Sequence, residues 1–207
     1  MGDGGCLIAF EGVEGAGKST QVRAAATALR ARGLTVLETR EPGGTPLGIE
    51  LRRLVMQRTD RPPAPLTELL LYLADRAQHL EEVIRPALQR GEVVLTDRFS
   101  ASTIAYQGFA RALDVDMVRR LDAVVRGNLA PVLTVLLDCP VDVGLRRAHG
   151  DDRFHLEDVQ FHERVRAAFL GFARDTPERY RVIDATRPSD AVREQVIRTV
   201  LECLHLQ

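Results

Sequence analysis

The stretch Gly12-Val-Glu-Gly-Ala-Gly-Lys-Ser-Thr20 decides the fold of this chain. It fits the pattern G-x-x-x-x-G-K-[ST], in which glycines allow backbone N–H groups to close around the phosphates of a nucleotide. In such a loop Lys18 reaches the β- and γ-phosphates, and the hydroxyl of Ser19 is a ligand of Mg²⁺. The helix that follows points the positive end of its dipole at the same phosphates. The stretch therefore predicts a nucleotide-binding loop between a strand and a helix.

The sequence around the loop supports this prediction. Residues 6–11 form a short apolar run, which is typical of a buried strand. Residues 21–32 are rich in Ala, Leu and Arg, which are strong helix formers. Lys18 is also the single lysine among 28 basic residues. Because a compact ammonium fits between phosphates better than a guanidinium fork does, this lysine favours a phosphate site over an incidental glycine-rich turn.

Size, charge and cysteine content exclude several classes of protein. A chain of 207 residues, 45% hydrophobic and 28% charged, is expected to form one globular domain over residues 1–207. The net charge of −1 provides no basic field for a nucleic acid. We find neither a signal peptide nor an apolar run of about 18 residues, so no membrane partner is expected. Three widely spaced cysteines without a C-x-x-C motif are typical of core residues in the reducing cytoplasm.

Five short apolar runs are predicted to be strands, and helical segments separate them. The strands are expected at residues 7–11, 35–39, 93–97, 132–138 and 180–184. The main helices are expected at residues 18–32, 46–56, 67–88 with a bend or restart at Pro86, 114–126, 141–148, 158–174 and 189–206. Strands that are apolar along their whole length are typical of a parallel sheet covered by helices on both faces. We therefore predict an α/β fold whose ligands lie at the carboxyl ends of the strands.

Two predicted strands end in an aspartate that could hold a metal ion. An apolar strand ending in Asp is where proteins with a phosphate loop bind their Mg²⁺. Asp97 is followed by Arg98 and a polar run at residues 100–107, whereas Asp138 leads into Cys-Pro and an ordinary helix. We therefore favour Asp97, together with Ser19, as the metal site and regard Asp138 as a strand-end cap.

Three arginines are candidates for holding a second, monophosphate substrate. Arg40 and Arg98 follow the second and third predicted strands, and Arg76 lies on the helix at residues 67–88. Guanidinium forks match a phosphate dianion with two parallel hydrogen bonds. The chain has no second lysine for the N-K-x-D element of switch GTPases, and it has no L-S-G-G-Q-like run of a transporter ATPase. The pattern therefore favours phosphoryl transfer between two substrates.

Five segments together resemble thymidylate kinases of the bacterial type. They are Phe10-Glu-Gly-Val-Glu-Gly-Ala-Gly-Lys-Ser-Thr20, Thr39-Arg-Glu-Pro-Gly-Gly-Thr45, Leu70-Leu-Tyr-Leu-Ala-Asp-Arg76, Asp97-Arg-Phe-Ser-Ala-Ser-Thr-Ile-Ala-Tyr-Gln-Gly108 and Val182-Ile-Asp-Ala185. The resemblance extends from residue 6 to about residue 203. It implies a P-loop nucleoside-monophosphate-kinase-like fold, with a five-stranded parallel sheet, helices on both faces and a short lid.

The same resemblance implies a reaction and its participants. The γ-phosphoryl group of ATP would be transferred to dTMP to give dTDP, with Mg²⁺, by a cytoplasmic homodimer. Residues that would bind ATP are Gly12, Val13, Glu14, Gly15, Ala16, Gly17, Lys18, Ser19 and Thr20. Residues that would act in catalysis are Lys18, Arg98, Arg153, Arg147 and Glu14.

The resemblance also implies which residues bind dTMP. Glu14 matches the acidic loop position that holds the sugar 3′-hydroxyl and helps to order the metal. Tyr72 matches the ring that stacks on thymine, and Arg76, on the same helix face, matches the residue that contacts a thymine carbonyl. Tyr106 matches the ring that crowds the 2′ position of the sugar. The other residues matched to this site are Arg40 and Arg98 around the phosphate, and Ser102, Thr103 and Gln107 around the base.

The phosphate loop carries one cation, Lys18, because its Gly15-Ala16 pair holds no arginine. The resemblance implies that a lid supplies the missing charge, and we expect this lid at about residues 146–157. Arg153 and Arg147 are the candidates for the charge-neutralising residue, with Arg146 behind them. The segment is shorter than the usual bacterial lid, it contains Asp151-Asp152, and His155 stands where an acidic residue is common. Arg146 and Arg147 fit solvated helix arginines equally well.

Two other functions stay open at this stage. A deoxynucleoside kinase would phosphorylate a neutral 5′-hydroxyl, so it would need a base there and would leave the arginines at positions 40, 76 and 98 unused. A nucleotide-binding regulatory domain without turnover is suggested only by the short lid.

Overall fold

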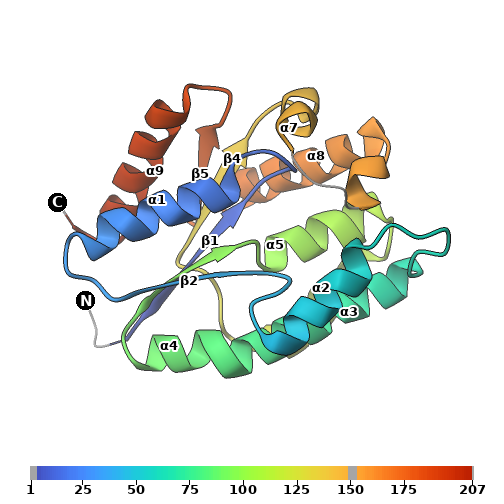
Figure 1. The fold of residues 1–207 in the computed structure, drawn as a ribbon, viewed down its shortest axis with the longest axis horizontal. Coiled ribbons are helices and arrows are strands. Elements are labelled where there is room, and N and C mark those ends of the chain that lie inside the picture. Colours follow the sequence, from blue (N-terminus) through green and yellow to red (C-terminus); the bar gives the residue numbers. More distant parts are fainter. Residues whose placement is uncertain (1–3, 149–152, 207) are drawn as a thin grey trace.

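The structure, a computed structural model, describes residues 4–148 and 153–206. In this part of the chain five parallel strands form one sheet in the order β2-β3-β1-β4-β5 (Figure 1). The strands are β1 (Cys6–Glu11), β2 (Val36–Arg40), β3 (Val93–Asp97), β4 (Leu133–Asp138) and β5 (Tyr180–Asp184). The predicted α/β fold is confirmed, and each strand boundary lies within one residue of its predicted position.

Helices and helical turns connect the strands. They are α1 (Lys18–Arg30), α2 (Pro46–Met56), α3 (Pro65–His79), η1 (Leu80–Ile84), α4 (Arg85–Gln89), α5 (Ser100–Thr103), η2 (Ile104–Ala110), α6 (Val115–Arg126), α7 (Val141–Arg147), η3 (Arg153–Leu156), α8 (Val159–Asp175) and α9 (Ser189–Cys203). None of the helices in the described ranges combines the length and the apolar character that a membrane crossing requires.

The long helix predicted over residues 67–88 does restart before Pro86. The π turn η1 separates α3 from α4, and α4 begins at Arg85. Proline has no N–H and its ring clashes with the carbonyl of the preceding turn, so a wider turn is one way to accommodate it.

The polar run after β3 is helical, which the sequence analysis did not predict. Residues 100–103 form α5, and residues 104–110 continue it as the π turn η2. Four residues of a polar sequence cannot form a stable helix alone. The first turn is held by Glu11 of β1, which accepts hydrogen bonds from two of its backbone N–H groups.

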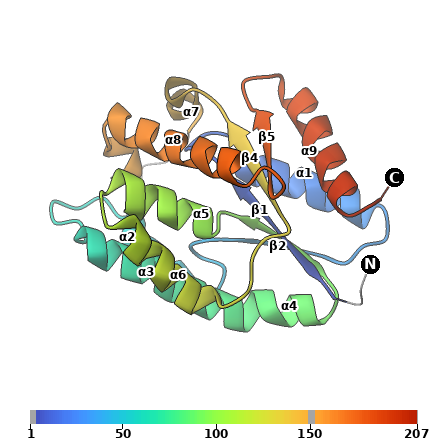
Figure 2. The same cartoon turned by 180° about the vertical axis from the view of Figure 1, so that it is seen from behind.

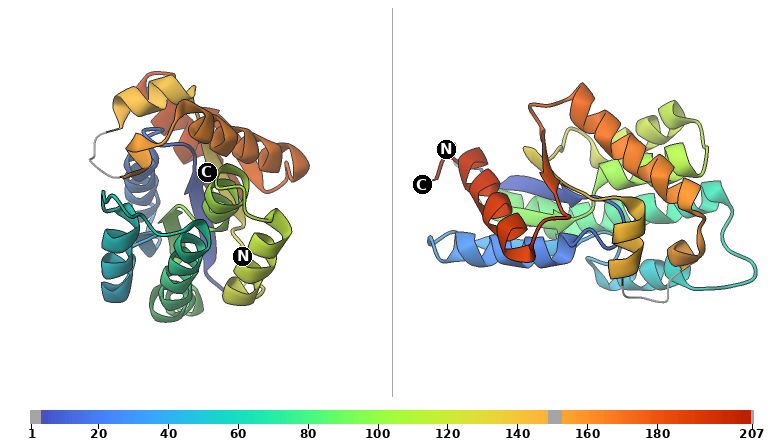
Figure 3. Two further views of the ribbon diagram at one scale, coloured as in Figure 1. Left: turned by 90° about the vertical axis from the view of Figure 1, so that its right-hand side faces the viewer. Right: turned by 90° about the horizontal axis from the view of Figure 1, so that it is seen from above.

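Helices cover both faces of the sheet, which explains why its strands are apolar throughout. On one face lie α1 and α9; on the other lie α4, α5, α6 and α8, which are seen in front in Figure 2. Leu7 and Ala9 of β1 pack in a cluster with Ile84, whereas Ile8 and Phe10 belong to the cluster that contains α1. Seen from above (Figure 3), α9 and the start of β1 lie at one end of the molecule and the α2–α3 connection lies at the other.

The strand register brings three loops together at the carboxyl edge of the sheet. Phe10 of β1 and Arg40 of β2 are both paired with Asp97 of β3. The loops that follow these strands therefore start at the same level. The order of the strands also reverses beside β1, which is where ligands bind in open α/β sheets.

Candidate active site

A cavity of about 510 Å³ lies at this carboxyl edge and contains the predicted phosphate loop. Cationic side chains dominate its wall, and those that the structure describes are Lys18, Arg23, Arg40, Arg52, Arg98 and Arg147. Acidic residues at the same wall are Glu14, Glu41 and Asp97. The cavity is thus suited to a polyphosphate and its metal ion, and we call it the phosphate cavity.

The phosphate loop has the backbone that its glycines predict. Gly15 has a φ of 69°, and a Cβ there would lie only 1.9 Å from the carbonyl oxygen of Gly144. The Nζ of Lys18 donates to the carbonyl oxygens of Gly12 and Val13, at 3.1 and 2.8 Å. These contacts hold the ammonium inside the loop, and its burial lowers the pKa of Lys18.

The two predicted metal ligands lie side by side. The Ser19 hydroxyl donates to Oδ2 of Asp97 at 2.5 Å, so one hard cation could contact both oxygens. Asp138 has a different role, because both of its carboxylate oxygens accept hydrogen bonds from Arg166, at 2.8 and 2.9 Å. The geometry therefore favours Asp97 over Asp138, as the sequence analysis does.

Arg98 lies where the phosphate cavity meets a second, aromatic pocket. Its guanidinium donates to Glu14, to Ser102 Oγ at 3.0 Å and to the hydroxyl of Tyr106 at 3.2 Å. It also lies over the Tyr106 ring, 5.0 Å from the centroid. Burial alone would raise the pKa of Glu14, but Arg98 and Lys18 outweigh it and lower that pKa to about 2. Glu14 is therefore a carboxylate at any physiological pH.

Glu11, which the sequence analysis did not identify as a site residue, supports Arg98 through the hydroxyl of Ser102. It is fully buried and accepts hydrogen bonds from the N–H of Phe99 at 2.9 Å and from Ser102 Oγ at 2.6 Å. Ser102 Oγ in turn accepts from Arg98. Burial, partly offset by the Ser102 hydrogen bond and the charge of Arg98, raises the pKa of Glu11 to about 7.

This raised pKa predicts a specific pH dependence of stability. Because the pKa of Glu11 is higher in the folded than in the unfolded protein, the folded protein binds a proton at Glu11 more tightly. This protonation stabilises the folded state fully below about pH 4.5, and the stabilisation is lost as pH rises through about 7. At 1.36 kcal/mol per pKa unit, the free energy of unfolding should fall by about 3 kcal/mol over this pH range. Between pH 5 and 8, Glu11→Gln should therefore gain stability relative to the unchanged protein. Urea unfolding of both proteins at each pH measures this difference, and a difference that stays constant would contradict it.

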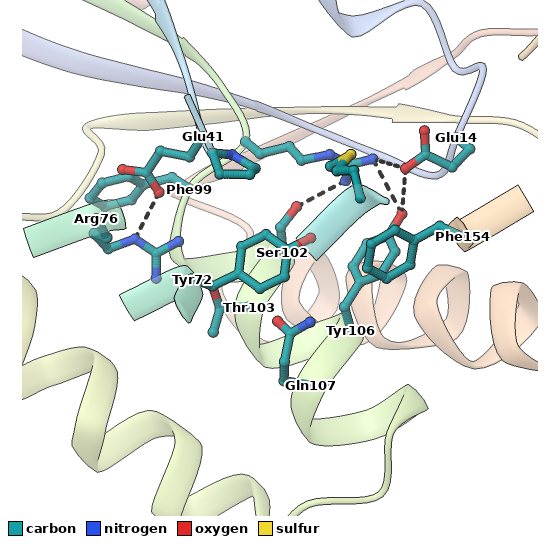
Figure 4. Close-up of a pocket in the computed structure, with 13 residues that line it drawn as sticks. Glu14, Glu41, Tyr72, Arg76, Phe99, Ser102, Thr103, Tyr106, Gln107 and Phe154 are labelled. Carbon is teal, nitrogen blue, oxygen red and sulfur yellow. Dashed lines mark hydrogen bonds and ion pairs between the residues drawn. The ribbon is translucent and has the colours of Figure 1, made fainter. Parts of the chain in front are cut away.

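The second pocket gathers most of the predicted acceptor residues. Tyr72 lies at its centre, between Arg76 and Tyr106 (Figure 4). The Oγ1 of Thr103 is buried, and no described residue is its hydrogen-bond partner. Other residues of the wall are Glu14, Glu41, Pro42, Met56, Arg98, Phe99, Ser102, Gln107 and Phe154. Aromatic rings with a few inward polar groups suit a flat heterocycle, so we call this the base pocket.

Arg76 is fixed by carboxylates that the sequence analysis did not identify. It is only 2% exposed, its Nε donates to Glu41 at 2.8 Å, and its Nη1 donates to Asp122 at 2.7 Å. The other Glu41 oxygen lies 3.0 Å from Nδ1 of His79. The guanidinium also lies over the ring of Phe99, 5.1 Å from its centroid. These contacts leave little freedom in how Arg76 faces the base pocket.

Comparison with known proteins agrees with this geometry. The model of the family described as thymidylate kinase matches residues 10–196. The chain belongs to the thymidylate kinase family. A thymidylate kinase of Pseudomonas fluorescens is 49% identical, with 98% of each chain covered, and one of Geobacter sulfurreducens is 47% identical, with 95% of this chain and 97% of the relative covered. The crystal structure of thymidylate kinase from Ehrlichia chaffeensis has a TM-score of 0.78 at 33% identity, covering 95% of this chain and 99% of that one.

The predicted lid arginines differ in where they lie relative to the phosphate cavity and the base pocket. Arg147 lines the phosphate cavity, and its Nη1 donates to the carbonyl of Ala185 at 2.7 Å. Arg146 is exposed and pairs with Asp142 at 2.8 Å. The structure does not bring Arg153 to the phosphate cavity. Residues 149–152 of the predicted lid, which include Asp151 and Asp152, lie outside the described part of the chain.

Arg153 and Gln107 converge instead on Glu68 of α3. The Arg153 guanidinium donates to Glu68 and, at 2.5 Å, to the carbonyl of Val55. Gln107 lines the base pocket, but its Nε2 donates to Glu68 at 2.7 Å. Glu68 supplies the negative partner that the buried guanidinium of Arg153 requires. The same carboxylate accepts the hydrogen bond from the Gln107 amide.

Proposed function

We propose that this chain transfers the γ-phosphoryl group of ATP to dTMP, giving dTDP and ADP. The observation that carries the proposal is that the phosphate cavity and the base pocket share four residues, Glu14, Glu41, Met56 and Arg98, of which Glu14 and Arg98 form an ion pair. A monophosphate whose base occupies the base pocket would therefore direct its phosphate at the loop that holds ATP. We ascribe the activity to the whole chain, residues 1–207, acting as one kinase domain.

The proposed reaction requires alignment and positive charge more than covalent chemistry. An oxygen of the acceptor phosphate bonds to the γ-phosphorus while the bond from that phosphorus to the β–γ bridging oxygen breaks, and ADP leaves. No general base is needed, because the acceptor oxygen is already anionic. Lys18 and Arg98 would neutralise the phosphates from two sides, and Arg147 is the best-placed lid arginine.

We further propose Mg²⁺ as the metal, held by Ser19 and Asp97. A hydroxyl and one carboxylate fit Mg²⁺ that completes its shell with phosphate oxygens and water. When bound, the ion would neutralise the charge that develops between the β- and γ-phosphates.

In the base pocket we propose that dTMP is recognised through its base and its sugar. Tyr72 would stack on thymine, Arg76 would donate to a thymine carbonyl, and Thr103 has a buried hydroxyl without a partner among the described residues. Glu14 would accept from the 3′-hydroxyl, and Tyr106 would crowd a 2′-hydroxyl. Ser102, Gln107 and Arg40 would act around them, Arg40 from the phosphate cavity.

We also propose that the enzyme acts in the cytoplasm as a homodimer. Leu47 on α2 and Leu70 on α3 are about half exposed, on two helices that pack against each other. Apolar side chains gathered on neighbouring helices are typical of subunit contacts. Sedimentation equilibrium measures the assembly, and Leu70→Arg should shift it toward the monomer.

The activity is tested by ADP release with ATP, Mg²⁺ and a panel of acceptors. The proposal expects dTMP to be the best substrate. Equal or better turnover of UMP, CMP or AMP would overturn the dTMP assignment, and turnover of thymidine alone would indicate a deoxynucleoside kinase. Tight ATP binding without ADP release for any acceptor would indicate a regulatory domain.

A further inference from the structure

We propose that Glu68 is a positioning residue of the acceptor site, although it lines neither cavity. It fixes the segment Arg153–Leu156 against the aromatic wall of the base pocket. This inference rests on the proposed function, since it concerns how that function's acceptor is held. It also gives Arg153 a role on the acceptor side in place of a role beside the γ-phosphate.

Glu68 joins three elements that are far apart in the sequence. Its side chain is fully buried on α3. Its Oε1 accepts from Gln107 of η2 at 2.7 Å, and its Oε2 accepts from Arg153 of η3. The Nε of Arg111, just after η2, lies 3.3 Å from Oε2. One carboxylate therefore fixes the distance between α3, η2 and η3.

The charges around Glu68 are balanced only while it is ionised. Its carboxylate faces two guanidiniums, those of Arg111 and Arg153. Arg111 has a second acidic partner, Glu157, at 2.5 Å, but the acidic partner of Arg153 in the described residues is Glu68. Neutralising Glu68 leaves the buried Arg153 without a counter-ion among the residues that the structure describes, and this loss of a negative partner favours displacement of the segment.

The position of the segment Arg153–Leu156 matters to the acceptor because Phe154, the residue after Arg153, lines the base pocket. The Arg153 guanidinium lies over the Phe154 ring, 4.8 Å from its centroid. The Phe154 ring meets the Tyr106 ring edge to face at 5.8 Å, and the Tyr106 hydroxyl contacts Arg98 and Glu14. Figure 4 shows Phe154 directly beside Tyr106. A displaced Phe154 would thus loosen the ring that contacts Arg98 and Glu14, which line both cavities.

The test is steady-state kinetics of Glu68→Gln, Arg153→Ala and the double variant, with dTMP and ATP varied separately. A misplacement of about 1 Å can cost up to about 100-fold, so we expect each single variant to raise KM for dTMP at least about ten-fold. KM for ATP should change much less. The double variant should be no worse than either single variant, since both remove the same contact. Glu81→Gln, at an exposed ion pair with Arg85, is the matched control.

The opposite pattern would overturn the proposal. If Arg153→Ala lowers kcat without changing KM for dTMP, and Glu68→Gln is silent, then Arg153 acts at the transferring phosphate. Effects of the two variants that add would also contradict a shared role. Should Glu68→Gln fail to fold, Arg153→Lys tests the same point, because it keeps the charge but loses the fork that joins Glu68 to Val55.

Binding measurements separate this proposal from the proposed function. Calorimetric titration of dTMP without ATP should show the same loss of affinity in Glu68→Gln. If the unchanged protein does not bind or phosphorylate dTMP, both proposals fall. If it phosphorylates dTMP and the variants bind dTMP normally, only the role of Glu68 is overturned.

Discussion

Replacement of Arg98 by alanine is expected to lower kcat/KM for dTMP by about 10³-fold or more, within the range known for arginines that stabilise phosphoryl transfer. Among the described residues, Arg98 is the cation that lines both cavities, and its loss would remove positive charge from the place proposed for the acceptor phosphate. It also leaves Glu14 without its main partner, so a negative charge remains beside the incoming phosphate. Coupled ADP release at varied dTMP measures the loss.

Lysine at this position should recover little activity. Arg98 contacts Glu14, Ser102 and Tyr106 simultaneously through its fork, and an ammonium cannot reproduce those directions. Arg90→Ala, at an arginine whose side chain is 60% exposed and pairs with Glu92, serves as the control for loss of an arginine. A loss of less than about ten-fold in Arg98→Ala would show that the acceptor phosphate is held elsewhere.

Replacement of Arg76 by alanine is expected to have the largest effect on stability. The variant would remove the guanidinium that two buried carboxylates share, leaving Glu41 with His79 and Asp122 with Arg126 as charged partners. Breaking a buried pair costs about 3–5 kcal/mol. For a chain of this length each kcal/mol lowers Tm by about 2–4 °C, so we expect a fall of about 10 °C or more. Thermal unfolding followed by circular dichroism measures it.

Arg146 provides the matched comparison for Arg76. Its ion pair with Asp142 is well exposed, with 68% and 63% of the two side chains accessible. Exposed ion pairs contribute little to stability, so Arg146→Ala should change Tm by at most a few degrees. Similar Tm values for the two variants would mean that His79 and Arg126 are sufficient partners for Glu41 and Asp122, and the ion-pair account of Arg76 would then be wrong.

The sheet could be predicted from the sequence because its signals are local. Each strand is an apolar run ended by polar or turn residues, and the register follows from parallel pairing. The π turns η1 and η2 could not be predicted in detail, because they depend on contacts with distant residues. The helix at residues 100–110, for example, is held by Glu11, which lies 88 residues before Phe99.

The candidate site shows the same division between local motifs and distant partners. Motifs located Glu14, Lys18 and Ser19, and the structure brings them to Asp97 and Arg98 as the resemblance implies.

The buried carboxylates that orient the arginines were not identified from the sequence. Arg76 and Asp122 are 46 residues apart, and no spacing rule joins them. Glu68 did leave a signal, because Glu68, Tyr72 and Arg76 recur every four residues and so share one helix face. Tyr72 and Arg76 on that face line the base pocket.

The placement of Lys18 makes the chain suitable for chemical footprinting. Lys18 is the sole lysine, so apart from the α-amino group it is the one amine that an acylating reagent can modify. Burial lowers its pKa, which increases the fraction of reactive neutral amine, while a bound polyphosphate would cover it. A single mass increment on one peptide would then report how much of the nucleotide site is occupied, without any introduced label.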